Sequence, residues 1–574
     1  MATLVHRQGA PFPAITGPAE LRLEDGAILG VDRGWPPDLP LGYHEILPLD
    51  GGRPTRLIVA PARCHMPEGL LTWGWAVQLY ALRSRESWGM GDLGDLGRLA
   101  EWSVGTLGAG AIVLNPLHAA LPLVPQEPSP YFPSSRRYRN PLYLRVEDVP
   151  GAGEAGLPVG RLAAEGRALN AERRIDRDAV LRLKMAALGD LWARASPGPA
   201  GFASYRAQQG RGLEEFAIFC TLAEHHRSGW RRWPAEHRHP GSPAVARFAS
   251  EHVERVAFHA WLQWLLDEQL DRAGRVLRLV TDLAIGFDGE GADAWAWQGL
   301  LAHGVTVGAP PDDFAPDGQD WGLPPFVPHR LRSAGYSPFI ETVRAGLRHA
   351  GGMRIDHVMG LFRLYWVPGG ATPRDGAYVR YPTNDLLAIL ALESERAGAL
   401  VIGEDLGTVE PGVRERLLAE RILSTRVVWF ESTAPAKYPR LSIAAVTTHD
   451  LPTVRGLWTG SDLREQAAVG VRSNVEGTEA LRTLLRTLTE LADDAPSDDV
   501  ALAVHRRLAE APSVLIAATL DDALGVAERP NLPGTKADRR PNWALALPEV
   551  LEQIETDPRV RAVGAALGDR RAPS

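Results

Sequence analysis

The chain has 574 residues, a formal net charge of -8 at pH 7 and 2 cysteines. Its length exceeds what one small hydrophobic core supports, which predicts a large domain with an accessory piece. The acidic balance excludes the basic surface that binds nucleic acids or anionic membranes.

The cysteine pattern and the apolar runs bear on location. Cys64 and Cys220 provide neither a disulfide framework nor a zinc-spaced cluster, so we expect no metal site and a reducing compartment. Residues 1–7 lack the long apolar core of a signal peptide. No apolar run approaches the ~18 residues of a membrane span. These patterns predict a cytoplasmic protein without a membrane partner.

The composition changes near residue 70. Residues 1–70 are rich in Pro and Gly and contain the short alternating runs 42–47 and 56–60, which predict a small N-terminal β domain. From 71 to 574, strand-like runs alternate with amphipathic helices, as in an α/β catalytic domain. Residues 155–272, approximately, are expected to form a helical insertion in this domain.

Several short apolar runs of the larger domain predict buried strands. They are residues 75–82, 111–114, 275–280, 353–355, 399–402, 426–429 and 442–446. Helical periodicity is clearest over residues 93–107 and 251–271. Short strands separated by helices predict a parallel sheet. No glycine-rich phosphate loop follows a strand, and polar residues end several strands, which favours a (β/α)8 TIM barrel over a doubly wound sheet.

Three of these runs lead into a carboxylate: Asp356, Glu404 and Asp450. Retaining cleavage of a glycosidic bond needs one carboxylate as nucleophile and another as proton donor. The pattern therefore predicts glycosidic-bond chemistry, although an Asp at a strand end is also a common helix N-cap. The 17 tryptophans fit either core packing or stacking on sugar rings.

A series of motifs resembles those of the 4-α-glucanotransferases, or amylomaltases, of glycoside hydrolase family 77. The resemblance extends from about residue 75 to about 550. In chain order the motifs lie at residues 79–92, 129–131, 141–143, 310–312 with 318–322, 354–357, 403–407, 447–450 and 531–535. The resemblance implies a TIM-barrel enzyme that acts on maltooligosaccharides and other α-1,4-glucans without a cofactor.

The resemblance also implies roles for the three carboxylates. Asp356 matches the nucleophile that forms a covalent glycosyl-enzyme, and Glu404 matches the general acid/base, which needs a raised pKa. Asp450 matches a third carboxylate that binds sugar hydroxyls. Arg354 lies two residues before Asp356, on the same face of the strand, where a guanidinium would keep the nucleophile ionised.

Other positions resemble substrate-binding residues of the family. His357 and His449 match hydroxyl-binding histidines, Tyr131 matches a residue that stacks on sugar, and Asp282 matches an outer residue of the site. Residues 312–322 resemble a mobile loop that covers the acceptor subsites. Its candidate contacts are Phe314, Gln319 and Trp321.

Three functions remain open at this point. The first is a 4-α-glucanotransferase that works by a retaining double displacement. The second is an α-glucan hydrolase of the amylase type, which the motifs at residues 310–322 and 531–535 disfavour because they are those of the transferases. The third is a non-catalytic glucan-binding protein. Such a protein is expected to lack at least one of the three carboxylates, and all three are present in this chain. The sequence does not predict the oligomeric state.

Overall fold

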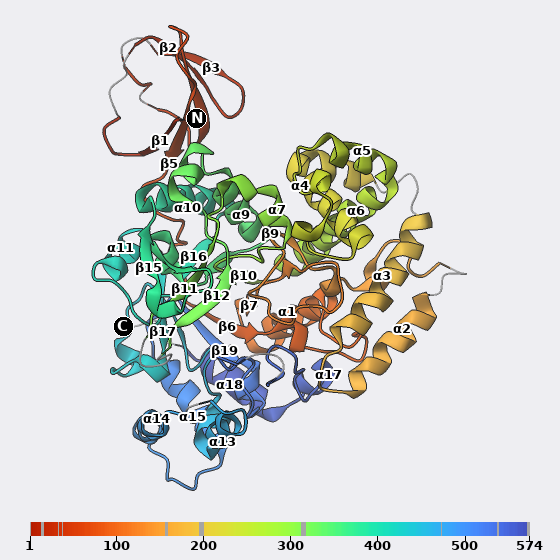
Figure 1. The fold of residues 1–574 in the computed structure, drawn as a ribbon. Helices are drawn as coiled ribbons and strands as arrows, with labels where there is room; N and C mark the ends of the chain where they lie inside the picture. The colour runs from red at the N-terminus through yellow and green to blue at the C-terminus, as the bar shows by residue number, and fades with distance from the viewer. Residues whose placement is uncertain are drawn as a thin grey trace. The chain divides into compact units, whose positions relative to one another are not determined.

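The structure is a computed structural model. It describes residues 2–12, 17–31, 34–36, 38–154, 159–194, 200–311, 317–471, 473–535 and 539–570. The chain divides into two compact units (Figure 1). The first unit comprises Met1–Gly69 with Trp297–Ser424, and the second comprises Leu70–Ala296 with Thr425–Ser574.

Eight strands form a closed barrel in the order β6, β7, β10, β13, β16, β17, β18 and β19, which confirms the predicted (β/α)8 fold (Figure 1). Their bounds are Thr72–Val77, Ala111–Leu114, Arg278–Leu283, Gly352–Ile355, Leu400–Gly403, Leu423–Val427, Ser442–Ala445 and Leu515–Thr519. The strands pair in parallel, as between β6 and β7 and between β13 and β16.

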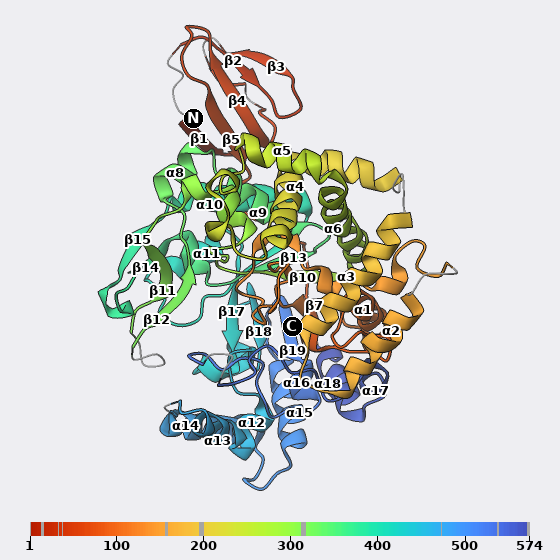
Figure 2. The same cartoon turned by 45° about the vertical axis from the view of Figure 1, so that its right-hand side comes forward.

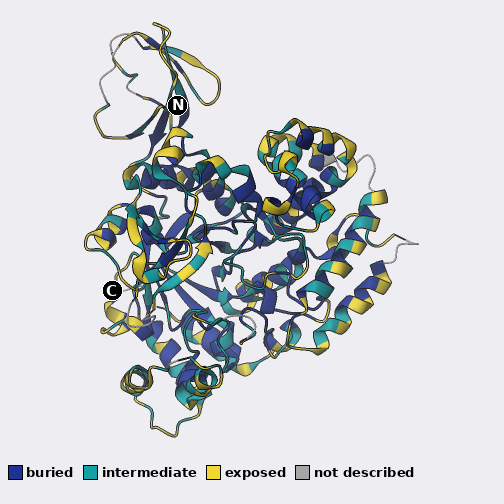
Figure 3. Cartoon of the chain, in the orientation of Figure 1, coloured by how far each residue is buried: buried dark blue, intermediate teal, exposed yellow. Residues whose placement is uncertain are grey.

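The barrel strands are largely apolar because parallel strands are buried on both faces. All four residues of β16 are buried, and so are the first four of β19 (Figure 3). The seven runs predicted from the sequence overlap seven of these strands, whereas β19 was not predicted. The polar residues after the runs lie at the carboxyl end of the barrel.

The first unit contains a five-stranded sheet in the order β1-β5-β4-β2-β3 (Figure 2). Its strands are Ala2–Arg7, Ala19–Arg22, Ile28–Val31, Gly42–Pro48 and Thr55–Ala60. Leu21, Leu57 and Val59 are fully or almost fully buried in its core. The Tyr43 hydroxyl of β4 donates a hydrogen bond of 2.6 Å to Glu393 Oε1 of helix α10 (Thr383–Ala397). The sheet is therefore fixed to a helix of the same unit.

A second, antiparallel sheet of the first unit has the order β12-β11-β14-β15. Its strands are Val305–Ala309 (β11), Gln319–Leu323 (β12), Arg363–Pro368 (β14) and Ala377–Arg380 (β15). The expectation of a loop through residue 322 is thus wrong for Gln319 and Trp321, which lie on β12. Pairing with β11 outweighs the weak strand propensity of this Gly- and Asp-containing run. The other helices of this unit are Pro328–Ser333 (α8), Ser337–Leu347 (α9) and Val413–Ala419 (α11).

The second unit is largely helical. Helix α1 spans Leu93–Leu107, as predicted. Its N-cap residue Asp92 and Asp95 in its first turn form a reciprocal capping box. The helices that follow are Val159–Ala168 (α2), Arg177–Arg194 (α3), Ala200–His226 (α4), Pro243–Glu251 (α5) and Val253–Gly274 (α6). The helix predicted over 251–271 corresponds to α6, which begins two residues later because the backbone leaves helical geometry at His252, between α5 and α6.

The remaining helices and strands of the second unit lie between and after its barrel strands in the sequence. They are His118–Ala119 (β8), Ser135–Arg139 (β9), Ala292–Ala296 (α7), Val454–Thr459 (α12), Ser461–Ala468 (α13), Val475–Thr489 (α14), Ser497–Leu508 (α15), Leu520–Ala523 (α16), Leu551–Ile554 (α17) and Pro558–Gly568 (α18). Across the described ranges, no helix is both long and apolar enough to cross a membrane.

Three strand boundaries differ from the sequence prediction. The run 75–82 is a strand to Val77 and then turns into a 3-10 helix, where Asn115 Oδ1 accepts a hydrogen bond of 2.7 Å from Leu79 N. The run 426–429 begins after most of β17 and ends in another 3-10 helix. Strand β10 continues to Leu283, so Asp282 lies within the strand and not after it.

Candidate active site

Asp356 and Glu404 leave the barrel from neighbouring strands at the same level. Strands β13 and β16 pair in parallel with Ile355 opposite Gly403, and the two acidic residues come next in each strand's sequence. Neighbouring strands lie about 4.8 Å apart. The register therefore brings these two carboxylate-bearing residues side by side at the carboxyl end of the barrel.

Both carboxylate oxygens of Glu404 accept backbone hydrogen bonds. His357 N donates to Oε2 at 2.9 Å, and Leu406 N donates to Oε1 at 2.8 Å. Burial nevertheless raises the pKa of Glu404, although the charge of Arg354 and both N–H groups lower it. A carboxyl that holds its proton more firmly than usual suits a group that must protonate a leaving oxygen.

Arg354 contacts the neighbouring carboxylate, with its Nη2 atom 3.4 Å from Asp356 Oδ1. Both side chains are partly buried, at 15% and 21% exposure. Alternation along β13 and its continuation places the two residues on one face, as predicted. The guanidinium thus lies where it favours the ionised form of Asp356.

His357 has a left-handed backbone, with φ 48°, which is uncommon for a residue with a side chain. Burial lowers the pKa of its imidazole, while the charge of Asp356 opposes this shift. The ring of Trp321 lies edge-on to the His357 ring, with centroids 5.5 Å apart. Trp321 Nε1 donates a hydrogen bond of 3.1 Å to Gln319 Oε1 on the same strand. Phe314 lies outside the described residues.

The second unit holds the other candidate residues. The Tyr131 hydroxyl donates a hydrogen bond of 2.7 Å to Asp282 Oδ2, and Asp282 is 4% exposed. The Tyr131 ring lies 5.1 Å from that of His449 and 5.4 Å from that of Trp543. Tyr131, His449 and Trp543 form an aromatic cluster, because the His449 and Trp543 rings are also 5.1 Å apart.

Asp450 lies in the segment that follows β18. Its Oδ1 accepts a hydrogen bond of 2.7 Å from Asn531 Nδ2, and its Oδ2 lies 3.4 Å from His449 Nε2. Its side chain is 43% exposed. A carboxylate with one oxygen held by protein donors and an exposed surface can bind a hydroxyl group of a ligand.

A family model decides which class of protein this is. The model for glycoside hydrolase family 77, described as 4-alpha-glucanotransferase, matches residues 77–551. The chain belongs to this family.

Relatives of the 4-alpha-glucanotransferase family resemble the chain over most of its length. A 4-alpha-glucanotransferase of Mycobacterium tuberculosis is 44% identical over 93% of this chain and 80% of its own. The crystal structure of amylomaltase from Corynebacterium glutamicum has a TM-score of 0.88 at 33% identity, over 98% of this chain and 89% of the other. Amylomaltase from Streptococcus agalactiae, solved with acarbose, shares the fold at a TM-score of 0.70 and 17% identity, over 87% of this chain and 99% of the other. The chain is a glucan-transferring enzyme, as its motifs predicted.

Sequence reasoning missed two residues that contact the candidate site residues. Asn531 belongs to a motif that supported the family resemblance, but its contact with Asp450 bridges 81 residues of sequence. Trp543 stands in a polar, Pro-containing stretch without a recognisable pattern, and it has a left-handed backbone with φ 60°. Its position beside Tyr131 and His449 follows only from tertiary structure.

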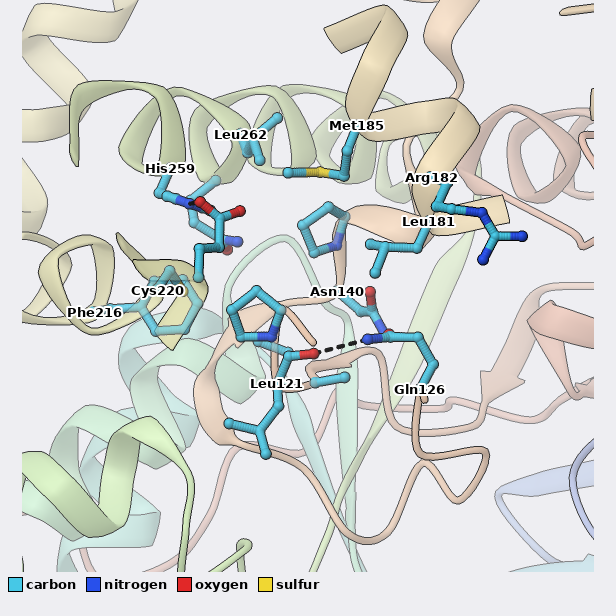
Figure 4. Close-up of a pocket in the computed structure, with 16 residues that line it drawn as sticks. Leu121, Gln126, Asn140, Leu181, Arg182, Met185, Phe216, Cys220, His259 and Leu262 are labelled. Carbon is cyan, nitrogen blue, oxygen red and sulfur yellow. Dashed lines mark hydrogen bonds and ion pairs between the residues drawn. The ribbon is translucent and has the colours of Figure 1, made fainter. Parts of the chain in front are cut away.

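A cavity of about 200 Å³ lies apart from the predicted site residues, none of which lines it. It is bounded by side chains of α3, α4 and α6 and by the segment around Leu121 and Gln126 (Figure 4). Its walls include Leu181, Phe216 and Leu262. Within the part of the chain that the structure describes, no group of three or more His, Cys, Asp or Glu residues could hold a metal ion.

Proposed function

We propose that the chain transfers α-1,4-glucan segments between maltooligosaccharides by a retaining double displacement, with Asp356 as nucleophile and Glu404 as general acid/base. The register of β13 and β16 carries this proposal, because it sets the two residues on adjacent strands at one level. Retaining glycosidases need carboxyl groups about 5–5.5 Å apart. That separation is close to the ~4.8 Å between neighbouring strands.

In the first step, an Asp356 carboxylate oxygen attacks the anomeric carbon of the donor sugar. The bond from that carbon to the leaving oxygen breaks, and the proton of Glu404 passes to this oxygen. The products are a shortened glucan and a glycosyl ester of Asp356. Arg354 favours the ionised nucleophile, and burial favours the protonated acid, so the two carboxyls start the step in the required states.

In the second step, Glu404 accepts the proton of an acceptor's 4-hydroxyl group. The hydroxyl oxygen attacks the anomeric carbon, and the bond to Asp356 breaks to regenerate the carboxylate. Two inversions leave the α configuration unchanged. Water at about 55 M competes for the same intermediate, so transfer requires an acceptor held in the right orientation and a site that excludes water. We assign this task to Gln319 and Trp321, and also to Phe314, which lies outside the described residues.

The remaining candidates bind the sugar in this proposal. Asp450, His357 and His449 hold ring hydroxyls, which carboxylate and imidazole groups can do as acceptors or donors. Tyr131 offers an aromatic face, and Asp282 fixes its hydroxyl. Acarbose, which the amylomaltase from Streptococcus agalactiae binds, is an oligosaccharide, which supports an extended sugar site.

The substrate class and location are part of the proposal. We assign maltooligosaccharides and longer α-1,4-glucans as donors and acceptors, and the cytoplasm as the site of action. Cys64 and Cys220 are free and buried, as suits a reducing compartment. Cell fractionation with an antibody to the protein tests the location, and recovery with secreted material contradicts it.

The test of the reaction is incubation of the purified protein with maltotriose and no cofactor, with products separated by chain length and reducing ends counted. We expect glucose and longer oligosaccharides at a constant number of reducing ends. Rising reducing ends without longer products contradict transfer. Asp356→Asn keeps the side-chain volume but removes the nucleophile, and it should lower turnover by at least ~1,000-fold. The matched control is Asp499→Asn, an exposed carboxylate of α15, with unchanged turnover.

A further inference from the structure

Asn531 holds the loop of Asp450 at two points. Its side-chain Nδ2 donates a hydrogen bond of 2.7 Å to Asp450 Oδ1, and its backbone N donates one of 3.0 Å to the His449 carbonyl. The first contact fixes the carboxylate, and the second fixes the backbone of the preceding residue. An exposed aspartate would otherwise rotate among several side-chain orientations.

The segment around Asn531 is itself fixed by a buried guanidinium. Arg529, which is 7% exposed, forms an ion pair with Asp462 of α13, with Nε 2.7 Å from Oδ1. Its Nη1 also donates a hydrogen bond of 2.9 Å to the Asp450 carbonyl. One side chain therefore joins helix α13, the Asp450 backbone and the segment that carries Asn531. A buried pair of this kind resists rearrangement, because separation leaves an uncompensated charge.

A second buried guanidinium reinforces the same segment. Arg540 Nη2 donates to the Arg529 carbonyl at 2.5 Å, and Arg540 Nη1 donates to Asn542 Oδ1 at 2.6 Å. Asn542 Oδ1 also accepts a hydrogen bond of 3.1 Å from Leu532 N. The residues on both sides of Asn531 are thus held by buried hydrogen bonds, so its amide is a preorganised donor.

We propose that Asn531 is a positioning residue for glucan transfer: its amide fixes Asp450 so that Oδ2 keeps one orientation, in which it binds a sugar hydroxyl. The inference rests on the proposed role of Asp450. Asparagine suits this task because its Nδ2 group is a donor without charge. It satisfies Oδ1 and favours the ionised carboxylate without neutralising it. His449 Nε2, at 3.4 Å from Oδ2, marks the side on which the substrate hydroxyl is bound.

A double-mutant cycle with Asp450 tests the proposal. Asn531→Ala should lower kcat/KM for maltotriose by on the order of 100-fold, as expected for a misoriented catalytic group. In an Asp450→Asn background, the same substitution should have almost no further effect, because Asn531 acts through that carboxylate. Equal effects in both backgrounds would overturn the inference. Wild-type activity of Asp450→Asn alone would instead reject the proposed role of Asp450.

A pH profile separates positioning from a structural role. Asn531→Asp keeps the side-chain shape but places a second carboxyl group next to that of Asp450. In such a pair, one of the two carboxyls has a strongly raised pKa. When a proton bridges the two oxygens at acid pH, the hydrogen bond to Asp450 returns. The activity of Asn531→Asp relative to the wild type should therefore rise as pH falls. A constant ratio across pH contradicts the proposal. Asn474→Ala, which removes the exposed N-cap of α14, is the control and should leave activity unchanged.

Discussion

The backbone N–H of His357 donates a hydrogen bond of 2.9 Å to Oε2 of Glu404, across neighbouring barrel strands. Because His357 directly follows Asp356, this bond ties the segment of the proposed nucleophile to the proposed acid/base. The left-handed backbone of His357 is a strained conformation for a residue with a side chain. The hydrogen bond to Glu404 helps to offset the free-energy cost of this conformation. A strained backbone at this position is consistent with a role in fixing the two carboxyls.

Glu404→Gln should separate acid catalysis from nucleophilic attack. With maltotriose, loss of the proton donor should lower kcat by on the order of 100- to 10,000-fold. With maltotriosyl fluoride as donor, fluoride leaves without protonation, so the first step should remain within about tenfold of the wild-type rate. Stopped-flow fluoride release measures that step. A loss with the fluoride donor as large as that with maltotriose would contradict the assignment of Glu404 as acid.

The pH dependence of kcat/KM should report the raised pKa of Glu404. Activity falls on the alkaline side as Glu404 loses the proton that the first step needs. The charge of Arg354 lowers this pKa. Arg354→Met should therefore move the alkaline limb to higher pH, while the residual rate falls because Asp356 loses its cationic neighbour. Arg374→Met, which removes an exposed guanidinium paired with Asp317, is the control and should leave the limb in place. A limb that moves to lower pH in Arg354→Met would contradict this account.

The edge-on contact between Trp321 and His357 bears on the choice between acceptor and water. Replacing the indole by leucine in Trp321→Leu opens space beside His357. We expect the ratio of hydrolysis to transfer to rise about tenfold, because water exclusion protects the glycosyl-enzyme. Counting reducing ends per transfer event with maltotriose measures this ratio.

A second tryptophan provides the control for that substitution. Trp458 of α12 donates its Nε1 hydrogen bond to the Ala495 carbonyl at 2.9 Å. Trp458→Leu should lower stability without changing the ratio of hydrolysis to transfer. If both variants change the ratio of hydrolysis to transfer alike, a general loss of protein stability explains the effect, and the position of Trp321 does not.

The parts of the site that could be predicted from the sequence are those with a local signal. A short apolar run followed by a carboxylate marks Asp356 and Glu404, because strand and functional residue are adjacent in sequence. The roles of these residues came from the family motifs and not from spacing. Strand ends were less predictable: the 3-10 turn after Val77 depends on a hydrogen bond that Leu79 N donates to Asn115 Oδ1, and Asn115 follows a different strand.

Contacts between segments that are distant in the chain leave no local pattern in the sequence. The hydrogen bond between Tyr131 and Asp282 joins residues 151 positions apart. Strand β12 was expected to be part of a loop because residues 312–322 resemble the mobile loop of the family. Its Gly and Asp residues have low strand propensity, and its pairing with β11 decides its conformation. The contacts of Asn531 with Asp450 and of Trp543 with His449 depend on tertiary structure and could not be predicted from the sequence.

Asp288 predicts a pH dependence of stability. Burial raises the pKa of this carboxyl from 3.8 to about 6, and its Oδ1 accepts a hydrogen bond of 2.8 Å from Glu290 N. The folded state therefore binds the proton more tightly than the unfolded state, and stability falls as pH rises from about 4 through 6. Asp288→Asn keeps the Oδ1 acceptor without the charge. It should raise the free energy of unfolding by about 1–3 kcal/mol at pH 8 and by about half as much at pH 5, as measured by urea denaturation. Asp25→Asn, at an exposed turn, should change neither value, and a gain for Asp288→Asn that is equal at both pH values would contradict the prediction.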